Sequence, residues 1–158
     1  MRFLAIPTDQ VRALQAGGRD AFGQIPERRI SDGAGVPCRH CLKIVAEGRP
    51  YLIVSHRPFS GVHPYAEQGP IFLCGDPCAD GSVSEALPPF LVSEHYIVRG
   101  YGEDERIAYG TGRVTPRPEI MAYCEGLLLR DDISFVHIRS ATNNCFHVRV
   151  ERSGGVQV

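Results

Sequence analysis

Long hydrophobic runs are missing from this sequence. Its longest purely aliphatic stretches, such as residues 127–129, are far shorter than the roughly 20 apolar residues of a membrane-spanning helix. The opening stretch, MRFLAIPTDQ, has one basic residue and an apolar run interrupted by Pro7 and Asp9, which is too brief for a signal peptide. We therefore expect no membrane partner and a cytoplasmic location, where cysteines are mostly reduced.

An excess of either charge is also absent. The chain has 17 basic and 18 acidic residues, for a formal net charge of −1. Proteins that bind nucleic acids usually carry a basic excess, often with aromatic side chains clustered for base stacking. The sequence shows neither feature, so we expect no nucleic-acid partner.

Internal repeats, low-complexity tracts and linkers are lacking as well. With 158 residues, 43% hydrophobic and 22% charged, the chain has the composition of an ordinary globular protein. We expect one domain over residues 1–158. Short strands between glycine- and proline-rich turns predict an α+β fold: mainly antiparallel β-sheet, with a short N-terminal helix and one amphipathic helix before a C-terminal hairpin.

The expected helices have clear boundaries. The first begins at Thr8, as an N-cap, and stops at Gly17. The second begins at Thr115-Pro116, and its apolar residues fall on one face. These residues are Ile120, Met121, Cys124, Leu127 and Leu128. Strands are expected at 28–31, 51–55, 70–74, 94–101 and 106–110.

The C-terminal hairpin, residues 133–152, is the part of the chain that can be interpreted furthest. A three-residue loop over 142–144 pairs Ile138 with Val148 and places the apolar side chains on one face. Asparagine, present at 143 and 144, tolerates the left-handed conformation that a three-residue hairpin loop with a bulge requires. The opposite face then carries Phe135, His137, Arg139, Cys145, His147 and Arg149, with Arg139 opposite His147 and His137 opposite Arg149.

That opposite face is either the solvated side of a sheet or the floor of an anion site. Arg99 and Tyr101 alternate along another strand, so their polar side could join it. Arginine forks and neutral histidines suit a carboxylate or phosphate group on a small molecule. The hypothesis is a ligand site made of Arg39, His40, Arg99, Tyr101, His137, Arg139, Asn144 and Cys145. It includes no metal and no cofactor, and leaves open whether the protein is an enzyme.

Four cysteines provide the alternative. Cys38 and Cys41 form a Cys-x-x-Cys pair, and Cys74 and Cys78 form a second pair at a spacing also known from structural zinc sites. They could make the protein a non-catalytic, zinc-stabilised interaction module. Alternatively, Cys74 is a core residue of an apolar strand. A redox role for the first pair is disfavoured, because the sequence shows no βαβ pattern around it.

A cysteine nucleophile is a further alternative. Cys145 and His147 would lie two residues apart on one strand face, as thiol and base. No glycine-rich oxyanion loop flanks Cys145, so a small packed residue is the favoured interpretation. A scaffold that binds a partner along an exposed sheet edge is neither supported nor excluded.

Four stretches in a fixed order resemble one known family. They are PCRHCL at 37–42, PYAEQGPIFL at 64–73, VRGYG at 98–102 and VHIRSATNNCF at 136–146. The chain is similar to the bacterial domain-of-unknown-function family 1203 from about residue 37 to 152. This resemblance implies a small, single-domain cytoplasmic protein, and it identifies no activity and no catalytic residue.

Overall fold

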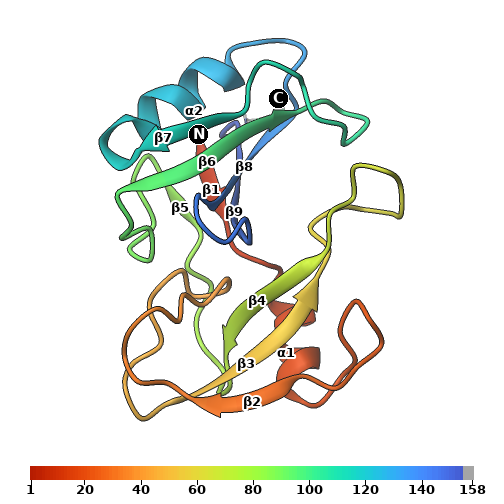
Figure 1. The fold of residues 1–158 in the computed structure, drawn as a ribbon, viewed down its shortest axis with the longest axis vertical. Helices are drawn as coiled ribbons and strands as arrows, with labels where there is room; N and C mark the ends of the chain where they lie inside the picture. The colour runs from red at the N-terminus through yellow and green to blue at the C-terminus, as the bar shows by residue number, and fades with distance from the viewer. Residues whose placement is uncertain (155–158) are drawn as a thin grey trace.

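A computed structural model describes residues 1–154 and contains two antiparallel sheets, one above the other along the long axis of the molecule (Figure 1). The strands of the larger sheet, in spatial order, are β5 (Val83–Ser84), β1 (Arg2–Leu4), β9 (Phe146–Glu151), β8 (Phe135–Ser140), β6 (His95–Tyr101) and β7 (Arg113–Pro116). The smaller sheet has the order β2 (Glu27–Ile30), β3 (Pro50–His56) and β4 (Gly69–Cys74).

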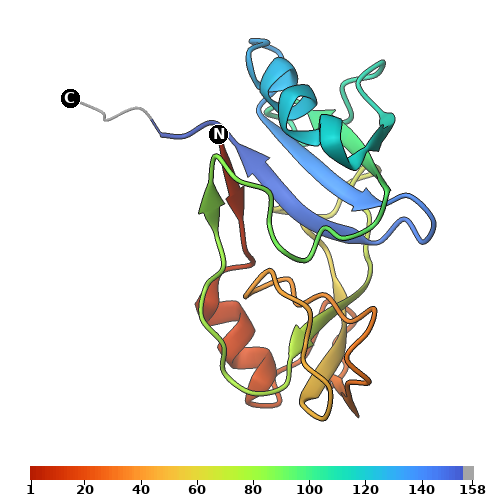
Figure 2. The ribbon, with the colours of Figure 1, turned by 90° about the vertical axis from the view of Figure 1, so that its left-hand side faces the viewer.

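Two α-helices accompany the sheets. Helix α2 (Ile120–Leu128) follows the 3₁₀ helix η1 (Arg117–Glu119) and packs on the larger sheet, whereas α1 (Thr8–Gln15) lies beside the smaller one (Figure 2). The face that α2 buries consists of Ile120, Cys124, Leu127 and Leu128. The expected α+β fold is confirmed. Among the described residues, no helix has the length and apolar character needed to cross a membrane.

The start of α1 differs in detail from the prediction. Pro7 occupies the N-cap position, and no side chain caps the helix. The Thr8 hydroxyl instead lies 2.9 Å from Nε2 of His40. Gly17, at the other end, has a φ of +90°, which suits glycine and ends the helix as expected.

The hairpin register is confirmed in its apolar half and wrong near the loop. Ile138 pairs with Val148, as predicted. A β-bulge then shifts the register, so that Arg139 faces Phe146 rather than His147. The Ser140 amide donates to the Cys145 carbonyl, so the loop has four residues, 141–144, rather than three. Asn144 has a φ of +59°, so one of the two loop asparagines adopts the left-handed conformation.

The predicted strand at 106–110 is wrong. Ile107 makes a single isolated bridge to Tyr101, and the neighbour of β6 is β7. The second helix consequently begins later than Thr115, which belongs to β7. Strands β1 and β5 were not predicted, because three and two residues are too few to show an alternating pattern.

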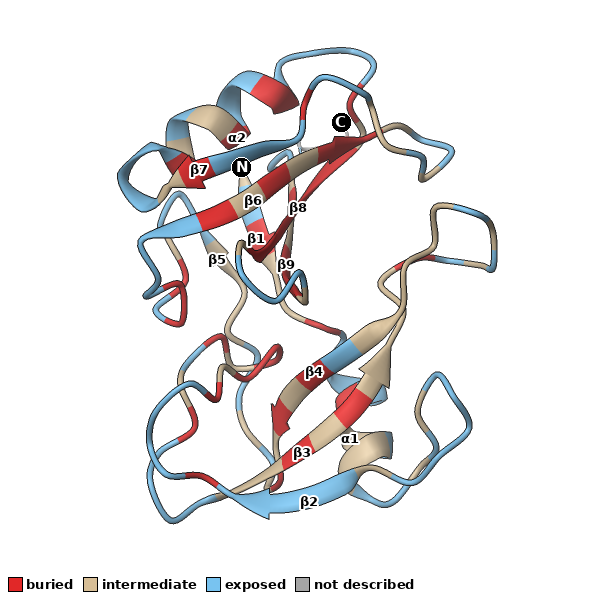
Figure 3. Cartoon of the chain, in the orientation of Figure 1, coloured by how far each residue is buried: buried red, intermediate tan, exposed pale blue. Residues whose placement is uncertain are grey.

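Burial shows that neither face of strand β8 is a solvated surface. All six residues of β8 are buried (Figure 3). Ile138 and Val148 belong to the core that includes α2. On the other side, His137 lies among aromatic rings that include Phe59 and Tyr101.

Residues 37–42 connect the two sheets. Cys38 forms a parallel bridge with Phe72 of β4, and the Arg39 amide donates to the Phe72 carbonyl. The Arg39 carbonyl accepts a hydrogen bond from the amide of Ile6, between β1 and α1. This connecting segment brings its reactive side chains to the junction of the two halves.

Candidate functional site

Four cysteine sulfurs gather at the end of the smaller sheet. The Sγ atoms of Cys38, Cys41, Cys74 and Cys78 all lie within 4.8 Å of one another, and we call them the four-cysteine cluster. The Cys38 and Cys78 sulfurs are 3.9 Å apart, and the Cys41 and Cys74 sulfurs are 3.8 Å apart. A tetrahedral zinc ion with bonds of about 2.3 Å separates its sulfur ligands by about 3.8 Å.

Backbone contacts hold the cluster in place. Cys74 ends β4, and the loop after it carries Cys78 back toward the connecting segment. From α1, Arg12 donates a hydrogen bond of 2.6 Å to the Cys78 carbonyl, and Gln15 donates one of 2.9 Å to the Cys74 carbonyl. Leu42, with a φ of +56°, reverses the chain directly after Cys41.

The sulfurs also receive hydrogen bonds. The backbone amides of His40 and Cys74 donate to the Cys38 sulfur over 3.4 and 3.2 Å. Nδ1 of His40 lies 3.1 Å from the Cys78 sulfur, and its Nε2 contacts Thr8. Contacts of this kind orient and tune thiolate ligands in metal sites.

Mutual hydrogen bonding polarises the four thiols. The Cys41 thiol, followed by those of Cys74 and Cys78, hydrogen-bonds to the Cys38 sulfur and lowers the pKa of Cys38. The contact with Cys38 in turn raises the pKa of Cys74 and of Cys78. The Cys38 thiolate is therefore favoured next to the protonated thiols of Cys74 and Cys78, and a dication would favour their deprotonation.

Packing alone does not account for this arrangement. Cys38 is buried, but Cys41, Cys74 and Cys78 are partly exposed, unlike cysteines that serve as small core residues. All four sulfurs share one centre instead of forming two separate pairs. The cluster has the donor chemistry and the spacing of a tetrathiolate metal site.

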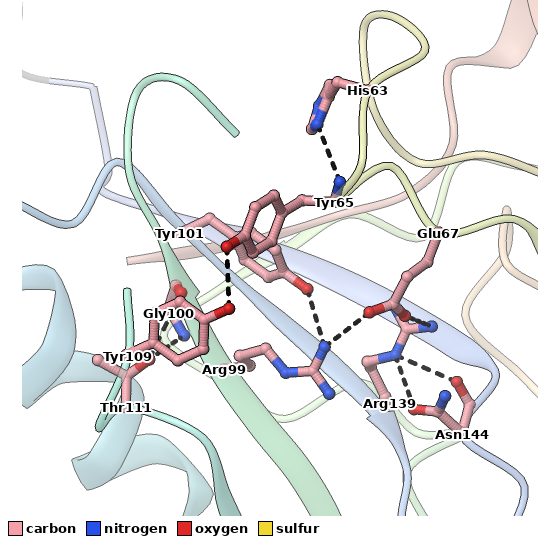
Figure 4. A network of polar contacts seen from close by, with 10 residues as sticks. All are labelled: His63, Tyr65, Glu67, Arg99, Gly100, Tyr101, Tyr109, Thr111, Arg139 and Asn144. Atoms are coloured by element: carbon pink, nitrogen blue, oxygen red, sulfur yellow. Dashed lines mark hydrogen bonds and ion pairs between the residues drawn. The ribbon is translucent and has the colours of Figure 1, made fainter. Parts of the chain in front are cut away.

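A second polar group forms between the loop before β4 and the larger sheet (Figure 4). Glu67 accepts a hydrogen bond of 2.9 Å from Nη1 of Arg99 and forms an ion pair of 2.6 Å with Nη2 of Arg139. Nη1 of Arg99 also lies 3.3 Å from the Tyr101 hydroxyl. Nε of Arg139 donates to the backbone and side-chain oxygens of Asn144 over 3.1 and 3.2 Å.

Arg139 borders a cavity of about 340 Å³ whose wall also includes Glu67, Asn144 and Cys145. We call it the arginine cavity. Arg139 is only 5% exposed, and within residues 1–154 its Nη1 atom has no hydrogen-bond partner. One carboxylate faces two guanidinium groups here, so the group has a net charge of +1. Such a group can attract an anion.

His137 lies next to this group without lining the cavity. It is fully buried, and neither ring nitrogen has a hydrogen-bond partner in the described part of the chain. Burial, then the positive charge of Arg149, holds the pKa of His137 well below its usual value. The imidazole is therefore neutral, as the sequence led us to expect.

Arg39 reaches the same region from the connecting segment. Its Nε donates to the Phe146 carbonyl over 2.8 Å, its Nη1 to the Pro37 carbonyl over 2.7 Å, and its Nη2 lies 3.6 Å from the Cys145 sulfur. Burial lowers the pKa of Arg39 to about 10, so the guanidinium remains charged at neutral pH.

The structure places His40 apart from the rest of the expected ligand group, and His147 away from the hairpin face on which it was expected. His40 lies beside the four-cysteine cluster, not in the arginine cavity. The bulge moves His147 onto the apolar side, where its ring packs against Phe90 and Tyr96. Glu67 was not predicted from the sequence, although this carboxylate lies in a loop within the family-like stretch 64–73.

A larger cavity of about 530 Å³ lies next to the arginine cavity and is lined in part by residues 57–60. It shares His56, Pro58 and Phe146 with the arginine cavity. Arg149 borders it, with its guanidinium 3.7 Å from the centroid of the Phe135 ring. Its polar groups are spread along an open groove, so we place the candidate site in the smaller cavity.

Comparison with known proteins gave one match. A family model described as "Protein of unknown function (DUF1203)" matches residues 35–152, about three quarters of the chain. No curated protein and no solved structure matches the chain.

Proposed function

The chain belongs to the DUF1203 family of proteins of unknown function, and from its own side chains we propose that it is a zinc-stabilised, non-catalytic binding module. The observation that supports this is the spacing of the four-cysteine cluster, with sulfurs 3.8 and 3.9 Å apart in two pairs and all within 4.8 Å. Four thiolates suit zinc, and a site with four protein ligands leaves no open position for a substrate.

The metal would strengthen the junction of the two sheets. Two of its ligands, Cys38 and Cys41, belong to the connecting segment, and Cys74 ends β4. Structural zinc contributes folding free energy directly, because the unfolded chain does not present the ligands together. This proposal replaces the expectation of a protein without metal.

Metal analysis of protein purified without added metal tests the proposal. We expect one zinc ion per chain, and its loss in Cys78→Ser. Cys145→Ala is the matched control, because Cys145 is partly exposed but lies outside the cluster. Protein without zinc, or a Cys78→Ser variant with full zinc, would overturn the proposal.

A second function concerns the arginine cavity, which we propose as a site for a small carboxylate or phosphate. The supporting observation is that Arg139 lines the cavity while its buried Nη1 atom has no partner within residues 1–154. Asn144 adds an amide to the same wall. Arg99 contributes through Glu67 and does not line the cavity itself.

Thermal denaturation with phosphate, oxalate or succinate tests this second proposal. A ligand that binds only the folded state raises the Tm with its concentration. We expect the shift to vanish in Arg139→Gln and to persist in Arg113→Gln, an exposed arginine that pairs with Glu119. If none of the anions raises the Tm, or if Arg139→Gln retains the full shift, the arginine cavity is not an anion site.

A further inference from the structure

Cys145 occupies an unusual position among the six cysteines. It follows the loop 141–144 of the C-terminal hairpin, is partly exposed and borders the arginine cavity. Cys124, by contrast, is fully buried against the larger sheet, and the other four cysteines form the cluster. Among the cysteines of the described chain, Cys145 is thus the one that borders the arginine cavity and lies outside the four-cysteine cluster.

The guanidinium of Arg39 contacts the Cys145 sulfur. Two of its nitrogen atoms are engaged by the carbonyls of Pro37 and Phe146, and Nη2 faces the sulfur at 3.6 Å. Arg39 is 2% exposed, and within residues 1–154 no carboxylate lies at ion-pair distance from it. A buried guanidinium without a carboxylate is costly, and the Cys145 sulfur is the partner that its third nitrogen contacts.

A second observation points to a ligand at the same place. Arg139 lines the same wall as Cys145, and its buried Nη1 atom lacks a partner among the described residues. His56 and Glu67 are the other titratable groups of this wall. Burial lowers the pKa of His56 to about 4, so His56 is neutral at pH 7. The carboxylate of Glu67 is already shared by Arg99 and Arg139. Reactive cysteines are typically found in such electropositive, partly exposed surroundings.

We propose that Cys145 is a reactive thiol that forms a covalent bond with small electrophiles carrying a carboxylate. The Cys145 sulfur bonds to the electrophilic carbon, the leaving group departs with its bonding electrons, and the thiol proton passes to water. Arg39 positions the sulfur, and Arg139 receives the carboxylate. His147 does not act as the base, because its Nδ1 faces the Cys145 carbonyl and its ring packs in the apolar core.

Alkylation of the native full-length protein tests this proposal with two probes, neutral iodoacetamide and anionic iodoacetate. In each, the sulfur–carbon bond forms as iodide leaves. Cleavage after arginine releases SATNNCFHVR from the wild type and residues 131–149 from Arg139→Gln. Cys145 is the single cysteine of both peptides, so mass spectrometry follows this residue alone. We expect Cys145 to react with iodoacetamide about tenfold faster than glutathione in the same buffer. A rate no faster than that of glutathione would overturn the proposal.

The iodoacetate reaction rests on the proposed anion site, whereas the iodoacetamide reaction does not. We expect a higher iodoacetate-to-iodoacetamide rate ratio for Cys145 than for glutathione. Arg139→Gln should reduce this ratio to the glutathione value while the iodoacetamide rate stays high. A fast iodoacetamide reaction without preference for iodoacetate would retain the reactive thiol and reject its selectivity for carboxylates.

Variants of Arg39 test its positioning role. We expect Arg39→Met to slow both reagents at Cys145 and Arg39→Lys to restore part of the rate, because lysine keeps the charge but not the fork. Circular dichroism checks that each variant is folded. If Arg39→Met folds and reacts at the wild-type rate, Arg39 has no positioning role, and if it does not fold, the wild-type rate still decides whether Cys145 is reactive.

Discussion

Glu67 and Arg139 form an ion pair of 2.6 Å between a loop that precedes β4 and strand β8 of the other sheet. The same carboxylate also accepts a hydrogen bond from Arg99. The Glu67 carboxylate therefore occupies part of the site in which we propose that the carboxylate or phosphate of a ligand binds. Ligand binding and the position of this loop should be linked.

Replacement of Glu67 by glutamine tests this link. We expect Glu67→Gln to lower the free energy of unfolding by about 2 kcal/mol, because two arginines lose their charged acceptor. The affinity for phosphate or succinate should rise about tenfold, since the competing carboxylate is gone. Titration calorimetry and urea denaturation measure the two effects. Glu119→Gln, in an exposed pair with Arg113, is the control and should change neither. Weaker anion binding in Glu67→Gln would show that Glu67 supports the site instead of competing for it.

Removal of the metal should destabilise the protein. We expect a strong zinc chelator, or Cys78→Ser, to lower the free energy of unfolding by more than about 4 kcal/mol, as expected for a lost structural metal. For a chain of this length that corresponds to a fall in Tm of about 10 °C. Calorimetry with and without chelator measures it, and Cys145→Ala should respond to chelator like the wild type. An unchanged Tm after chelation would mean that the cluster does not hold a stabilising metal.

Buried histidines should make the fold sensitive to acid. Burial lowers the pKa of His147 to about 3 and that of His56 to about 4. Because the unfolded chain takes up these protons near pH 6.5, stability is complete above that pH and falls as the pH decreases toward the folded values. Each of the two histidines should account for about 2 kcal/mol between pH 7 and pH 5.

Urea denaturation at the two pH values measures this loss. His147→Phe keeps a ring next to Phe90 and Tyr96 and should reduce the difference between pH 7 and pH 5. His95→Gln, at an exposed position, is the control. Equal stability at both pH values in the wild type would contradict the prediction.

Gly81 supplies a steric test of the cluster's backbone. A Cβ atom at this position would lie 2.0 Å from the carbonyl oxygen of Cys41, so the backbone next to a proposed zinc ligand would have to move. We expect Gly81→Ala to destabilise the fold by about 1–3 kcal/mol and to weaken zinc retention. Thermal denaturation and metal analysis measure the two effects.

Gly126→Ala is the matched control for this substitution. A Cβ atom at Gly126 would meet no neighbouring atom within 4 Å, and alanine is favoured over glycine in a helix such as α2 by about 1 kcal/mol. The Tm and the zinc content should therefore fall in Gly81→Ala alone. A Gly81→Ala variant with the Tm and zinc content of the wild type would show that the backbone at this position can shift without loss of stability.

Much of the fold could be predicted from local patterns. The apolar alternation around Ile138 and Val148 determined the hairpin pairing, and helical spacing identified the buried face of α2. The bulge near Arg139 could not be predicted, because one extra residue in a strand leaves no mark on the apolar pattern of the remaining residues. It changed the side on which His147 lies, and with it the proposed base for Cys145.

The candidate site was predictable only in part. Spacing paired Cys38 with Cys41 and Cys74 with Cys78, but only the fold shows that the two pairs share one centre. The meeting of Arg99 and Arg139 follows from neighbouring strands, as expected from their alternation. Glu67 and Arg39 reach these strands through long-range contacts, which the pattern of each segment by itself does not reveal.

Consecutive residues of the connecting segment belong to two different sites. Cys38 and Cys41 belong to the four-cysteine cluster, while Arg39, directly after Cys38, points to Cys145. A single rigid peptide unit therefore links Cys38, a proposed zinc ligand, to Arg39, whose guanidinium contacts the Cys145 sulfur. Zinc bound to the cluster would hold the backbone at Cys38 and so fix the orientation of the Arg39 side chain. An oxidant or chelator that removes the metal would then also change the position of Arg39 relative to Cys145, and with it the reactivity of Cys145 at the arginine cavity.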